Sequence, residues 1–523
     1  MWRPTGCAIL QTAVLLPSLI QLAQCVENDE SLIRLRLMEL VAEILTQPGL
    51  LGFLAVFYAL LEVAGIATAV HAVFNARSAQ GSTAWAISLI AIPLIALPFY
   101  LVFGRSRFSG YVDARRHSDI AHSWIAEKAR TVCNEFHSDL PDYGGRLSFL
   151  ERLAHLPFTY GNRVELLING EAAFESMFEA IEKAEKYVLI QFFIVRDDNL
   201  GRRLQDALIA KVTQGVDVYF LYDQMGGRKL PKSVIREYRE AGVRMEAFRS
   251  SKFFANPMQV NFRNHRKILV VDGDLAFVGG LNVGDEYLGK SPRFGPWRDT
   301  HTAVEGPSAD ALQLIFAEDW HWATGETIHE LKWETRKAEG GDADVLILPS
   351  GPADDYESCN LMFVHAIHSA QNRFWIASPY FVPNAEVVSA LQVAGLRGVD
   401  VRILLPANPD HFMVYLASFY YMKLTGARGI RFYRYAEGFM HQKAFLIDDF
   451  GVGIGTANLD NRSFRLNFEI TLLSVNYELA ASVEEMFERD FACSQQVSHE
   501  EINERSALFK LGAAGARLLS PIL

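Results

Sequence analysis

The chain has 523 residues, of which 50% are hydrophobic, and it carries a formal net charge of -11. This length can bury a sizeable core in about two to four domains, whereas the acidic charge argues against a general nucleic-acid-binding protein, because a phosphate backbone requires a basic surface. The five cysteines are scattered without a CxxC pair or a His/Cys cluster, which indicates neither a disulfide framework nor a zinc site and favours a reducing compartment.

The N-terminal segment, residues 1–49, begins with one basic residue and an apolar stretch: MWRPTGCAILQTAVLLPSLIQLAQC. This order is typical of a signal peptide, and the final LAQC resembles a lipoprotein cleavage site. The glutamine before the cysteine fits such a site poorly, and an export signal makes little sense ahead of the membrane hairpin that follows. We therefore interpret the segment as a short extra apolar segment or an upstream extension of the reading frame, with a signal as the third alternative.

Two apolar runs within residues 50–104 predict a transmembrane hairpin. Residues 50–74 are long enough to cross a hydrocarbon core of about 30 Å, which takes roughly 20 helical residues. Residues 84–103 carry no charge, and Pro93 and Pro98 are expected to be tolerated as kinks within one membrane helix. The alternative, two buried helices of a soluble core, is less compatible with two long apolar runs joined by about ten residues.

The arginines around the hairpin indicate its orientation. The loop between the two runs holds one basic residue, Arg77, whereas four arginines follow the second run: Arg105, Arg107, Arg115 and Arg116. The positive-inside rule therefore places both ends of the hairpin, and all that follows, in the cytoplasm. Glu62 and His71 interrupt the first run. Because ionisable groups in a membrane are costly and often functional, Glu62 is a candidate for function, while His71 lies near enough to the end of the run to reach the interface.

From about residue 166 the chain contains the same pattern twice. A helical segment followed by a β-branched and aromatic run occupies residues 172–195 and again residues 359–382. Each copy continues with a similar strand, GVDVYFLYD from Gly215 and GVDVRILLP from Gly398. The alternation of strands and helices with short glycine turns predicts parallel α/β layers.

This repeat predicts the domain organisation of the remaining chain. Residues 105–165 are expected to form a juxtamembrane linker, followed by one α/β repeat over residues 166–340 and a second over residues 341–523. The same face of each repeat can meet at a shared cleft, so we expect one active site built from both repeats. The first repeat carries extra residues around SSKFFANPMQ, 250–259, which we expect to form a loop near the mouth of this site.

Each repeat closes with a strand in which a histidine, a lysine and an aspartate have the same spacing, HRKILVVD and HQKAFLID. Because side chains alternate along a strand, His265 and Lys267 share one face, as do His441 and Lys443. Two lysines can offset the charge of a phosphodiester, while one imidazole attacks phosphorus and the other protonates the leaving alkoxide. This scheme needs no metal and no organic cofactor. A single HxK on a strand would usually be a solvated edge, but its duplication with the same spacing indicates function.

Four further residues are candidates for the same site. Asn282 and Asn458 end the sequences GGLN and GTAN that follow the motifs, and their amides can donate to phosphoryl oxygens. Asp299 in WRDTH and Glu469 in LNFEI can each bind the second ring nitrogen of a histidine and so fix its tautomer.

The aspartates that complete the two motifs, Asp272 and Asp448, are counted with the catalytic residues as part of the pattern. Each lies five residues beyond its lysine, at a strand end before a turn. Holding that turn fits this position at least as well as contact with substrate does.

Several sequences around these residues share a resemblance to one family: GGLNVGDEY, PWRDTHTAVEGP, SPYFVPN, GFMHQKAFLID and GTANLDNRSFRLNFE. Together with the paired HxKxxxxD motifs, they resemble the phospholipase D superfamily, and most closely the bacterial cardiolipin synthases. The likeness runs from about residue 50 to the C-terminus, since that family also begins with a two-span hairpin. It implies an α/β fold of two pseudo-symmetric phospholipase D-like repeats sharing one active site, in the bacterial inner membrane with the repeats on the cytoplasmic side.

The resemblance also implies a ping-pong transfer of a phosphatidyl group between two phosphatidylglycerol molecules, giving cardiolipin and glycerol. His265 would form a phosphohistidine, and His441 would protonate the leaving glycerol and then deprotonate the second lipid, although pseudo-symmetry leaves the reverse assignment open. The two lysines and the two asparagines match the superfamily's phosphate ligands. The two acids match the residues that orient its histidines.

Several alternatives would use the same residues. A phospholipase D proper would pass the phosphatidyl group to water, and a related synthase would take phosphatidylethanolamine as donor. A catalytically silent lipid-binding scaffold predicts decay of at least one motif, and both are intact. The hairpin and the acidic charge argue against a nuclease. The expected partners are thus membrane phospholipids and not nucleic acid, and no particular protein partner is indicated.

Overall fold

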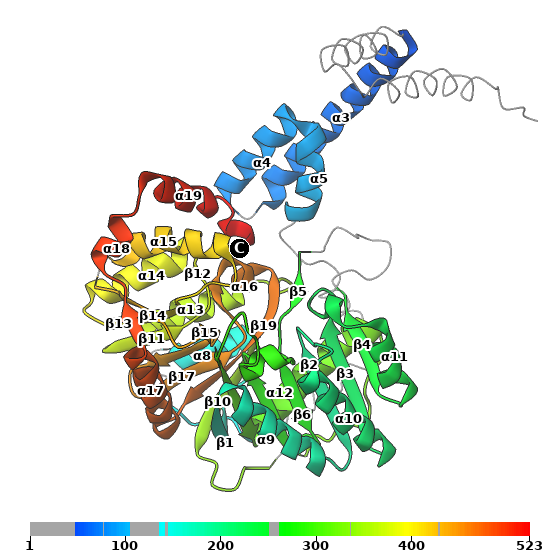
Figure 1. The fold of residues 1–523 in the computed structure, drawn as a ribbon, viewed down its shortest axis with the longest axis vertical. Helices are drawn as coiled ribbons and strands as arrows, with labels where there is room; N and C mark the ends of the chain where they lie inside the picture. The colour runs from blue at the N-terminus through cyan, green and yellow to red at the C-terminus, as the bar shows by residue number, and fades with distance from the viewer. Residues whose placement is uncertain are drawn as a thin grey trace, which may run out of the picture. The chain divides into compact units, whose positions relative to one another are not determined.

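The computed structural model describes the following parts of the chain (Figure 1): residues 48–76, 78–104, 135–141, 145–249, 261–334, 336–426 and 429–523. They belong to two compact units, Met1–Arg105 and Ser106–Leu523. Most of the predicted N-terminal segment, the arginines on which the orientation of the hairpin rests and the loop expected at residues 250–259 lie outside the described residues.

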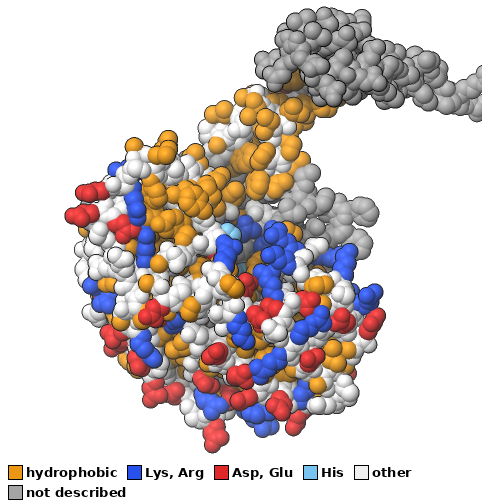
Figure 2. Space-filling view, viewed as in Figure 1, with side chains coloured by type: hydrophobic (Ala, Val, Ile, Leu, Met, Phe, Trp, Pro, Cys, Tyr) orange, Lys and Arg blue, Asp and Glu red, His pale blue; other side chains and the backbone are white. Residues whose placement is uncertain are grey.

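The first unit contains the apolar helices α3 (Pro48–Asn75), α4 (Ala79–Ala91) and α5 (Pro93–Phe103). Among the described residues, only the part of α3 from Gly52 to Asn75 forms a helix long and apolar enough to cross a membrane. The visible surface of α4 and α5 carries hydrophobic or uncharged side chains (Figure 2).

The second predicted span is divided into two helices. α4 ends before Ile92, whose φ of -140° and ψ of 59° are not helical, and Pro93 then opens α5. The ring of a proline disfavours helical geometry at the preceding residue, and its nitrogen has no hydrogen to donate. A break therefore replaces the kink expected at Pro93, whereas Pro98 is accommodated inside α5.

The two candidate residues of α3 have different surroundings. Glu62 is exposed on the surface of the unit. Nδ1 of His71 lies 2.8 Å from the hydroxyl oxygen of Tyr100 on α5, and Trp85 packs edge-on against the same tyrosine. His71 thus has a polar partner on α5, and its position near a membrane interface stays a prediction.

Among the described residues, the second unit is built on a mixed sheet of 16 strands, of which 15 follow one another and the sixteenth, β5 (Arg263–Asn264), pairs with β19 at the side (Figure 1). One half of the sheet contains, in spatial order, β1 (Thr159–Ile168), β9 (Thr300–Glu305), β7 (Leu275–Gly279), β6 (Ile268–Val271), β2 (Tyr187–Phe192), β3 (Asp217–Asp223) and β4 (Arg244–Phe248). The other half contains β10 (Ala343–Ser350), β19 (Asn467–Val475), β17 (Gly451–Gly455), β16 (Ala444–Ile447), β11 (Arg373–Ala377), β13 (Asp400–Pro406), β14 (Arg431–Tyr435) and β20 (Ser494–Gln496). The halves meet where β1 pairs antiparallel with β10.

The strand order contains the same unit twice. In each half a parallel set, β2–β3–β4 or β11–β13–β14, continues into an antiparallel hairpin, β6–β7 or β16–β17. Parallel strands covered on both faces are apolar along their whole length, and every residue of β2 is buried. This arrangement confirms the predicted α/β class with two similar repeats.

Helices pack around this sheet (Figure 1). Those before the second repeat are α8 (Arg146–Ala154), α9 (Asn169–Lys183), α10 (Asn199–Thr213), η1 (Gly226–Lys229), α11 (Lys232–Glu240), η2 (Asp285–Leu288) and α12 (Pro307–Thr324). Those that follow are α13 (Ser358–Ser369), α14 (Ala385–Leu396), α15 (Phe412–Gly426), α16 (Asn461–Arg465), α17 (Tyr477–Ala492), α18 (His499–Asn503), α19 (Ala507–Arg517) and η3 (Ser520–Ile522).

The largest buried cluster of the second unit contains side chains of both halves. Leu312 and Phe316 of α12 belong to the same cluster as Ile347 of β10 and Phe374 of β11. A close-packed core of this kind resists relative movement of the parts that share it. The two repeats are therefore held as one body, which allows residues from both to form one site.

Candidate active site

A short parallel pairing places the first histidine beside the second repeat. The two-residue strand β5 (Arg263–Asn264) pairs with the start of β19. The backbone N–H of His265, which follows β5, donates to the carbonyl oxygen of Phe468 at 2.9 Å. His265 consequently stands beside Glu469, the next residue of β19.

A second short parallel pairing places the other histidine beside the first repeat. The strand β15 (Phe439–Met440) pairs in parallel with β8 (Trp297–Arg298) of the first repeat. The backbone N–H of His441 donates to the carbonyl oxygen of Arg298 at 2.8 Å. His441 consequently stands beside Asp299.

The acid of each repeat contacts the histidine of the other repeat. Nδ1 of His265 lies 2.9 Å from Oε2 of Glu469, and Nδ1 of His441 lies 2.9 Å from Oδ2 of Asp299. The sequence identified both acids as candidates without indicating which histidine each would contact. The crossed contacts mean that neither repeat holds a complete histidine–acid pair of its own.

Both motif lysines are buried beside the histidines. Nζ of Lys267 donates to the backbone carbonyl oxygen of His265 at 2.6 Å. Nζ of Lys443 lies 2.6 Å from Nδ1 of His441 and 4.0 Å from Oδ2 of Asp299. These lysines place positive charge next to both imidazoles. The described residues include no group of three or more His, Cys, Asp or Glu side chains placed to hold a metal ion.

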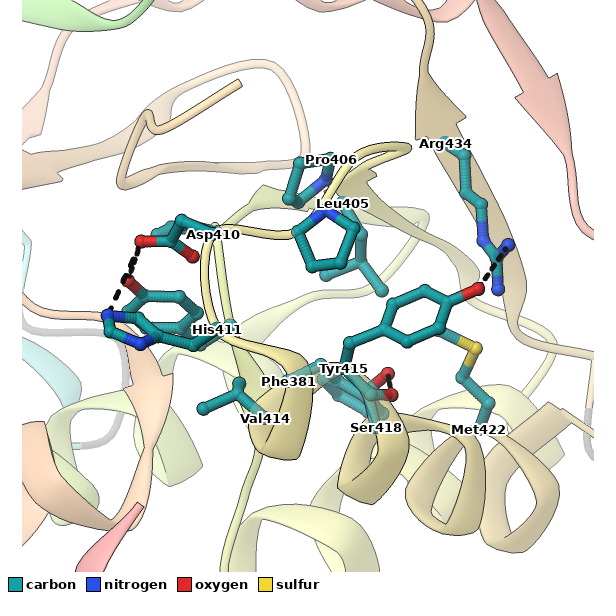
Figure 3. A pocket seen from close by; sticks show the side chains of 13 residues that line it. Phe381, Leu405, Pro406, Asp410, His411, Val414, Tyr415, Ser418, Met422 and Arg434 are labelled. Atoms are coloured by element: carbon teal, nitrogen blue, oxygen red, sulfur yellow. Dashed lines mark hydrogen bonds and ion pairs between the residues drawn. The ribbon is translucent and has the colours of Figure 1, made fainter. Parts of the chain in front are cut away.

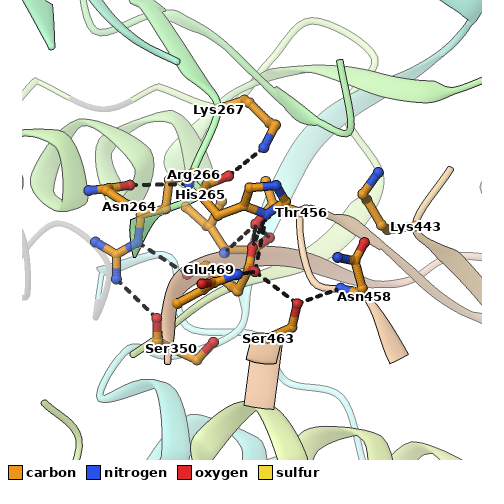
Figure 4. Close-up of polar contacts among 12 residues, drawn as sticks. Asn264, His265, Arg266, Lys267, Ser350, Lys443, Thr456, Asn458, Ser463 and Glu469 are labelled. Carbon is orange, nitrogen blue, oxygen red and sulfur yellow. Dashed lines mark hydrogen bonds and ion pairs between the residues drawn. The ribbon is translucent and has the colours of Figure 1, made fainter. Parts of the chain in front are cut away.

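Three further side chains hold Glu469 in place (Figure 4). The hydroxyl of Thr456 donates to Oε2 at 2.5 Å, the hydroxyl of Ser463 to Oε1 at 3.0 Å, and Nδ2 of Asn467 to Oε1 at 3.0 Å. A buried carboxylate with this many donors is fixed in position and stabilised in its ionised form.

Gly280 and Thr456, each two residues before an asparagine, lie against the two acids. Gly280 lies so close to Asp299 that a Cβ there would be 2.0 Å from Oδ1. Thr456, at the same point of the second repeat, instead contributes its hydroxyl to Glu469. The change from Gly280 in GGLN to Thr456 in GTAN is therefore a difference in how the two acids are held.

Burial lowers the pKa of His265 to about 4, although the neighbouring Glu469 acts to raise it. Burial and the charge of Lys443 also lower the pKa of His441. Burial alone would raise the pKa of each acid. Lys443 and His441 outweigh this effect at Asp299, and the charge and hydrogen bond of His265 do so at Glu469, so both pKa values lie below the ordinary range. Ionised acids accept the Nδ1 protons, which leaves the lone pair of each neutral imidazole on Nε2.

Burial also lowers the pKa of Lys267 to about 7 and that of Lys443 to about 8, while the two acids act to raise both values. A phosphodiester bound between the lysines would raise these pKa values, because it adds a negative charge nearby. Binding of an anionic substrate would therefore increase the fraction of both lysines that is protonated.

The aspartates that end the motifs lie at the far ends of their strands. Asp272 accepts hydrogen bonds of 2.7 to 2.8 Å from the N–H groups of residues 185–187, and Asp448 accepts bonds of 2.8 to 3.2 Å from those of residues 371–373. Both have left-handed backbones, with φ of 53° and 52°. Their carboxylates hold the turns that lead into β2 and β11, and the structure does not bring them to the histidines.

The two asparagines also differ in their contacts. Oδ1 of Asn282 accepts from the N–H of Ile194 at 3.0 Å, and its Nδ2 donates to the hydroxyl of Tyr287 at 3.2 Å. Oδ1 of Asn458 is buried and has no hydrogen-bond partner among the described residues. The sequence predicts the same phosphate-binding role for both asparagines, whereas their hydrogen-bond partners in the structure differ.

Two buried ion pairs beside the histidine strands were not found from the sequence. Arg266 pairs with Asp319 of α12 at 2.9 Å, and Arg298 pairs with Asp490 of α17 at 2.7 Å. The partners are 53 and 192 residues apart, so no local spacing in the sequence relates them. They attach Arg266, the residue after His265, to α12 and Arg298, the residue before Asp299, to α17.

Two families match parts of this chain. The family described as "Cardiolipin synthase, PLD-like domain" matches residues 177–291 and 363–491, which contain the two histidine motifs. The family described as "Phospholipase D-nuclease N-terminal" matches residues 63–105. Both parts of the chain are therefore covered by families related to phospholipase D.

Curated relatives and a solved structure extend this similarity. Cardiolipin synthase A of Pseudomonas fluorescens (strain Pf-5) is 48% identical over 486 residues, which are 91% of this chain and 99% of the relative. Cardiolipin synthase A of Pseudomonas aeruginosa (strain PAO1) is 46% identical over 475 residues, 88% of this chain and 95% of the relative. The crystal structure of phosphatidylserine synthase from Haemophilus influenzae has a similar fold, with a TM-score of 0.55 and 15% identity over 72% of this chain and 100% of that one. The chain belongs to the cardiolipin synthase family of the phospholipase D superfamily.

Proposed function

We propose that this protein is a cardiolipin synthase that transfers a phosphatidyl group from one phosphatidylglycerol molecule to another and releases glycerol. The observation that carries the proposal is the crossed pairing of His265 with Glu469 and of His441 with Asp299, which sets two imidazoles and two lysines in one site. The relatives named cardiolipin synthase A support this choice of reaction.

In the first step, Nε2 of His265 attacks the phosphorus of phosphatidylglycerol. The phosphorus–nitrogen bond forms as the bond from phosphorus to the glycerol oxygen breaks, and protonated His441 donates its proton to that oxygen. Lys267 and Lys443 offset the charge on the phosphoryl oxygens, and the amide of Asn458 faces the same group. Nucleophilic attack requires a neutral imidazole, and the pKa of His265 near 4 keeps it neutral.

In the second step, the terminal hydroxyl of another phosphatidylglycerol attacks the phosphohistidine. His441 accepts the hydroxyl proton while the new phosphorus–oxygen bond forms and the phosphorus–nitrogen bond breaks. Cardiolipin leaves, His265 is regenerated, and His441 is protonated for the next cycle. Acid and base are thus the same imidazole in opposite protonation states.

The apolar helix α3 and the family to which the chain belongs indicate association with a membrane. We infer a finer arrangement in the bacterial inner membrane, with α3 as one span, α4 and α5 as the other, and the repeats at residues 166–340 and 341–523 in the cytoplasm. The arginines that follow the second apolar run support this orientation. A cysteine placed at Gln80 should react with an impermeant thiol reagent only from outside the cell, and one placed at Lys510 only from inside; the reverse pattern would contradict the orientation.

The experiment that tests the reaction supplies the reconstituted protein with labelled phosphatidylglycerol alone and then with phosphatidylethanolamine added. Cardiolipin with an equal amount of glycerol from the first lipid alone is the expected result. Phosphatidic acid in place of cardiolipin would identify a hydrolase. Cardiolipin with ethanolamine release, formed only after the second lipid is added, would identify a different donor.

A further inference from the structure

An open pocket lies in the second repeat, beyond the ends of its parallel strands (Figure 3). Its walls come from the residues after β11, the ends of β13 and β14, the residues just before α15, and α15 itself. Asp410 and His411 form one side, with the hydroxyl of Tyr380 beside Asp410, and Arg434 lies on the other side. The pocket thus places a carboxylate, a hydroxyl and a cation around one hollow of the surface.

The carboxylate of Asp410 is held by its neighbours. The hydroxyl of Tyr380 donates to Oδ2 at 2.7 Å, and Nε2 of His411 lies 3.5 Å from the same oxygen. Burial and the charge of Asp410 raise the pKa of the Tyr380 hydroxyl well above its ordinary value, so this hydroxyl remains a donor. A fixed carboxylate is a strong acceptor for the hydroxyl groups of an alcohol.

The cation on the opposite side has an unused donor. Nη1 of Arg434 lies 2.9 Å from Glu501, whereas its Nη2 is buried and has no hydrogen-bond partner among the described residues. A buried donor without an acceptor is costly, and a phosphate oxygen is an acceptor that suits a guanidinium group.

The pocket belongs to the side of the active site that contains His441. Nη2 of Arg293 donates to the backbone carbonyl oxygen of Asp410 at 3.4 Å, and Arg293 stands shortly before β8, whose partner strand β15 leads into His441. The charge of Asp410 also acts to raise the pKa of His441 and of Lys443. A ligand in the pocket would therefore lie on the His441 side of the site.

The equivalent place in the first repeat is built from different residues. Val195 and Phe381 are equivalent, because each pairs with the residue directly after the asparagine of its repeat. The residue before each differs, being Ile194 in the first repeat and Tyr380 in the second. In the first repeat η1 also packs so closely that a Cβ at Gly226 would lie 1.9 Å from a backbone carbonyl oxygen. The pocket therefore distinguishes the two sides of an otherwise pseudo-symmetric site.

We propose that this pocket binds the polyol headgroup whose hydroxyl is exchanged at His441, namely the departing glycerol in the first step and the glycerol headgroup of the acceptor lipid in the second. This inference rests on the proposed function, and it places the alcohol of that reaction in a pocket of the second repeat. Asp410 and Tyr380 hold the hydroxyls that do not react, and Arg434 binds the phosphate of the acceptor lipid. Because the alcohol enters beside His441, His265 is left as the nucleophile.

The test is a competition between two soluble alcohols for the phosphohistidine. The full-length reconstituted protein receives phosphatidylglycerol with labelled glycerol and labelled methanol together, and labelled phosphatidylglycerol and phosphatidylmethanol are measured. Methanol has the reacting hydroxyl and no other, so the product ratio reports the binding of the additional hydroxyls, whatever the rate at which the phosphohistidine forms. We expect the wild type to favour glycerol, with the glycerol-to-methanol ratio lowered about tenfold by Asp410→Asn and about threefold by Tyr380→Phe.

Asp355→Asn, which changes an exposed carboxylate of the same repeat, is the matched control and should keep the wild-type ratio. If Asp410→Asn fails to fold, Tyr380→Phe carries the test, because it removes a single oxygen. Ratios within about twofold of the wild type in the folded pocket variants would overturn this inference and leave the proposed function standing. A wild type that makes cardiolipin without preferring glycerol to methanol would do the same. Transfer to neither alcohol nor to a second lipid would overturn both.

Discussion

The two histidines of the site differ in the residues that surround them. Glu469 accepts from Thr456 and two other side chains as well as from His265. Asp299 accepts from the backbone N–H of Thr300 at 2.9 Å and from Nε1 of Trp297 at 3.4 Å as well as from His441, and it is packed against Gly280. Both acids are therefore held in place, and the proposal of His265 as nucleophile rests on the pocket on the side of His441.

Replacing either His265 or His441 with alanine should lower cardiolipin formation by at least about a thousandfold, because each step needs both imidazoles. Membrane fractionation and circular dichroism should show that both variants remain folded and membrane-bound. A phosphatidyl ester of p-nitrophenol then separates the two roles, since p-nitrophenol departs without protonation. His441→Ala should release a burst of p-nitrophenol, and His265→Ala should release none. The opposite pattern would reverse the assignment.

The pH dependence of kcat/KM should follow the two buried lysines. Lys267, with a pKa of about 7, and Lys443, with a pKa of about 8, carry their charges below these values and lose them as the pH rises. Because His441 must be protonated to release glycerol, and burial lowers its pKa, kcat/KM should be highest below neutral pH and should begin to fall before the lysine values are reached. The fall should continue as the pH passes through the two lysine values, because the protonated lysines bind the phosphoryl group. At the acid end it should fall as the pH drops toward the pKa of His265, about 4. A profile that still rises above the lysine values would contradict this assignment.

The motif aspartates should act on stability more than on chemistry. Asp272→Asn weakens hydrogen bonds to three backbone N–H groups and should lower the free energy of unfolding by about 1 to 3 kcal/mol, measured by denaturant titration. Asp448→Asn, at the equivalent turn, should have a similar effect. The folded fraction of each variant should retain near-normal turnover; a well-folded but inactive variant would show that the aspartate takes part in the reaction.

At the scale of the elements, very short strands position the chemistry and helices hold those strands. β5 and β8 have two residues each, too few to be stable by their own hydrogen bonds. Arg266, two residues after β5, pairs with Asp319 of α12, and Arg298 of β8 pairs with Asp490 of α17, so both segments are attached to helices. The precision of the site therefore depends on helices that do not contribute a catalytic group.

Breaking one of these pairs should cost far more than breaking an exposed pair on the same helix. Asp490→Ala leaves Arg298 buried without its partner and should lower the free energy of unfolding by about 3 to 5 kcal/mol. Glu485→Ala removes the exposed pair with Arg489 on α17 and should cost less than about 1 kcal/mol. Thermal unfolding of the two variants in the same detergent compares them. Equal effects would mean that the buried pair does not anchor the strand.

The sequence predicted local elements better than contacts between distant ones. His265 and Lys267 lie in the three residues between β5 and β6, and not within a strand as predicted, but they are only two residues apart, so a single stretch of sequence was enough to place both in the site. The contact of His265 with Glu469 depends on the register between β5 and β19, which no local pattern contains. The sequence indicated that Pro93 would disturb the helix. The non-helical backbone of Ile92 shows that the helix is interrupted there and not merely kinked. The pocket was missed because Asp410 follows a strand in a loop, where its neighbours are set by the fold alone.

At the scale of the whole molecule, one chain should carry one complete site. The shared core fixes both repeats, and both histidine–acid pairs lie within the same chain. Mixing purified His265→Ala and His441→Ala proteins in one membrane should therefore restore no cardiolipin synthesis. Restored activity would show that the repeats of different chains form sites together, and a mixture with wild-type protein serves as the positive control.

The crossed acids also have a consequence for biosynthesis. His265 and Glu469 are 204 residues apart, and His441 and Asp299 are 142 residues apart, so neither imidazole is oriented until its distant partner has been synthesised and docked. A nascent chain emerges from the ribosome N-terminal part first, and contacts between distant residues form late. The growing chain, already attached to the membrane by its first helices, thus passes nearly all of its synthesis without an active site. The surrounding lipids are exposed to phosphodiester-cleaving chemistry only once the last repeat has folded and can direct each phosphatidyl group to an alcohol.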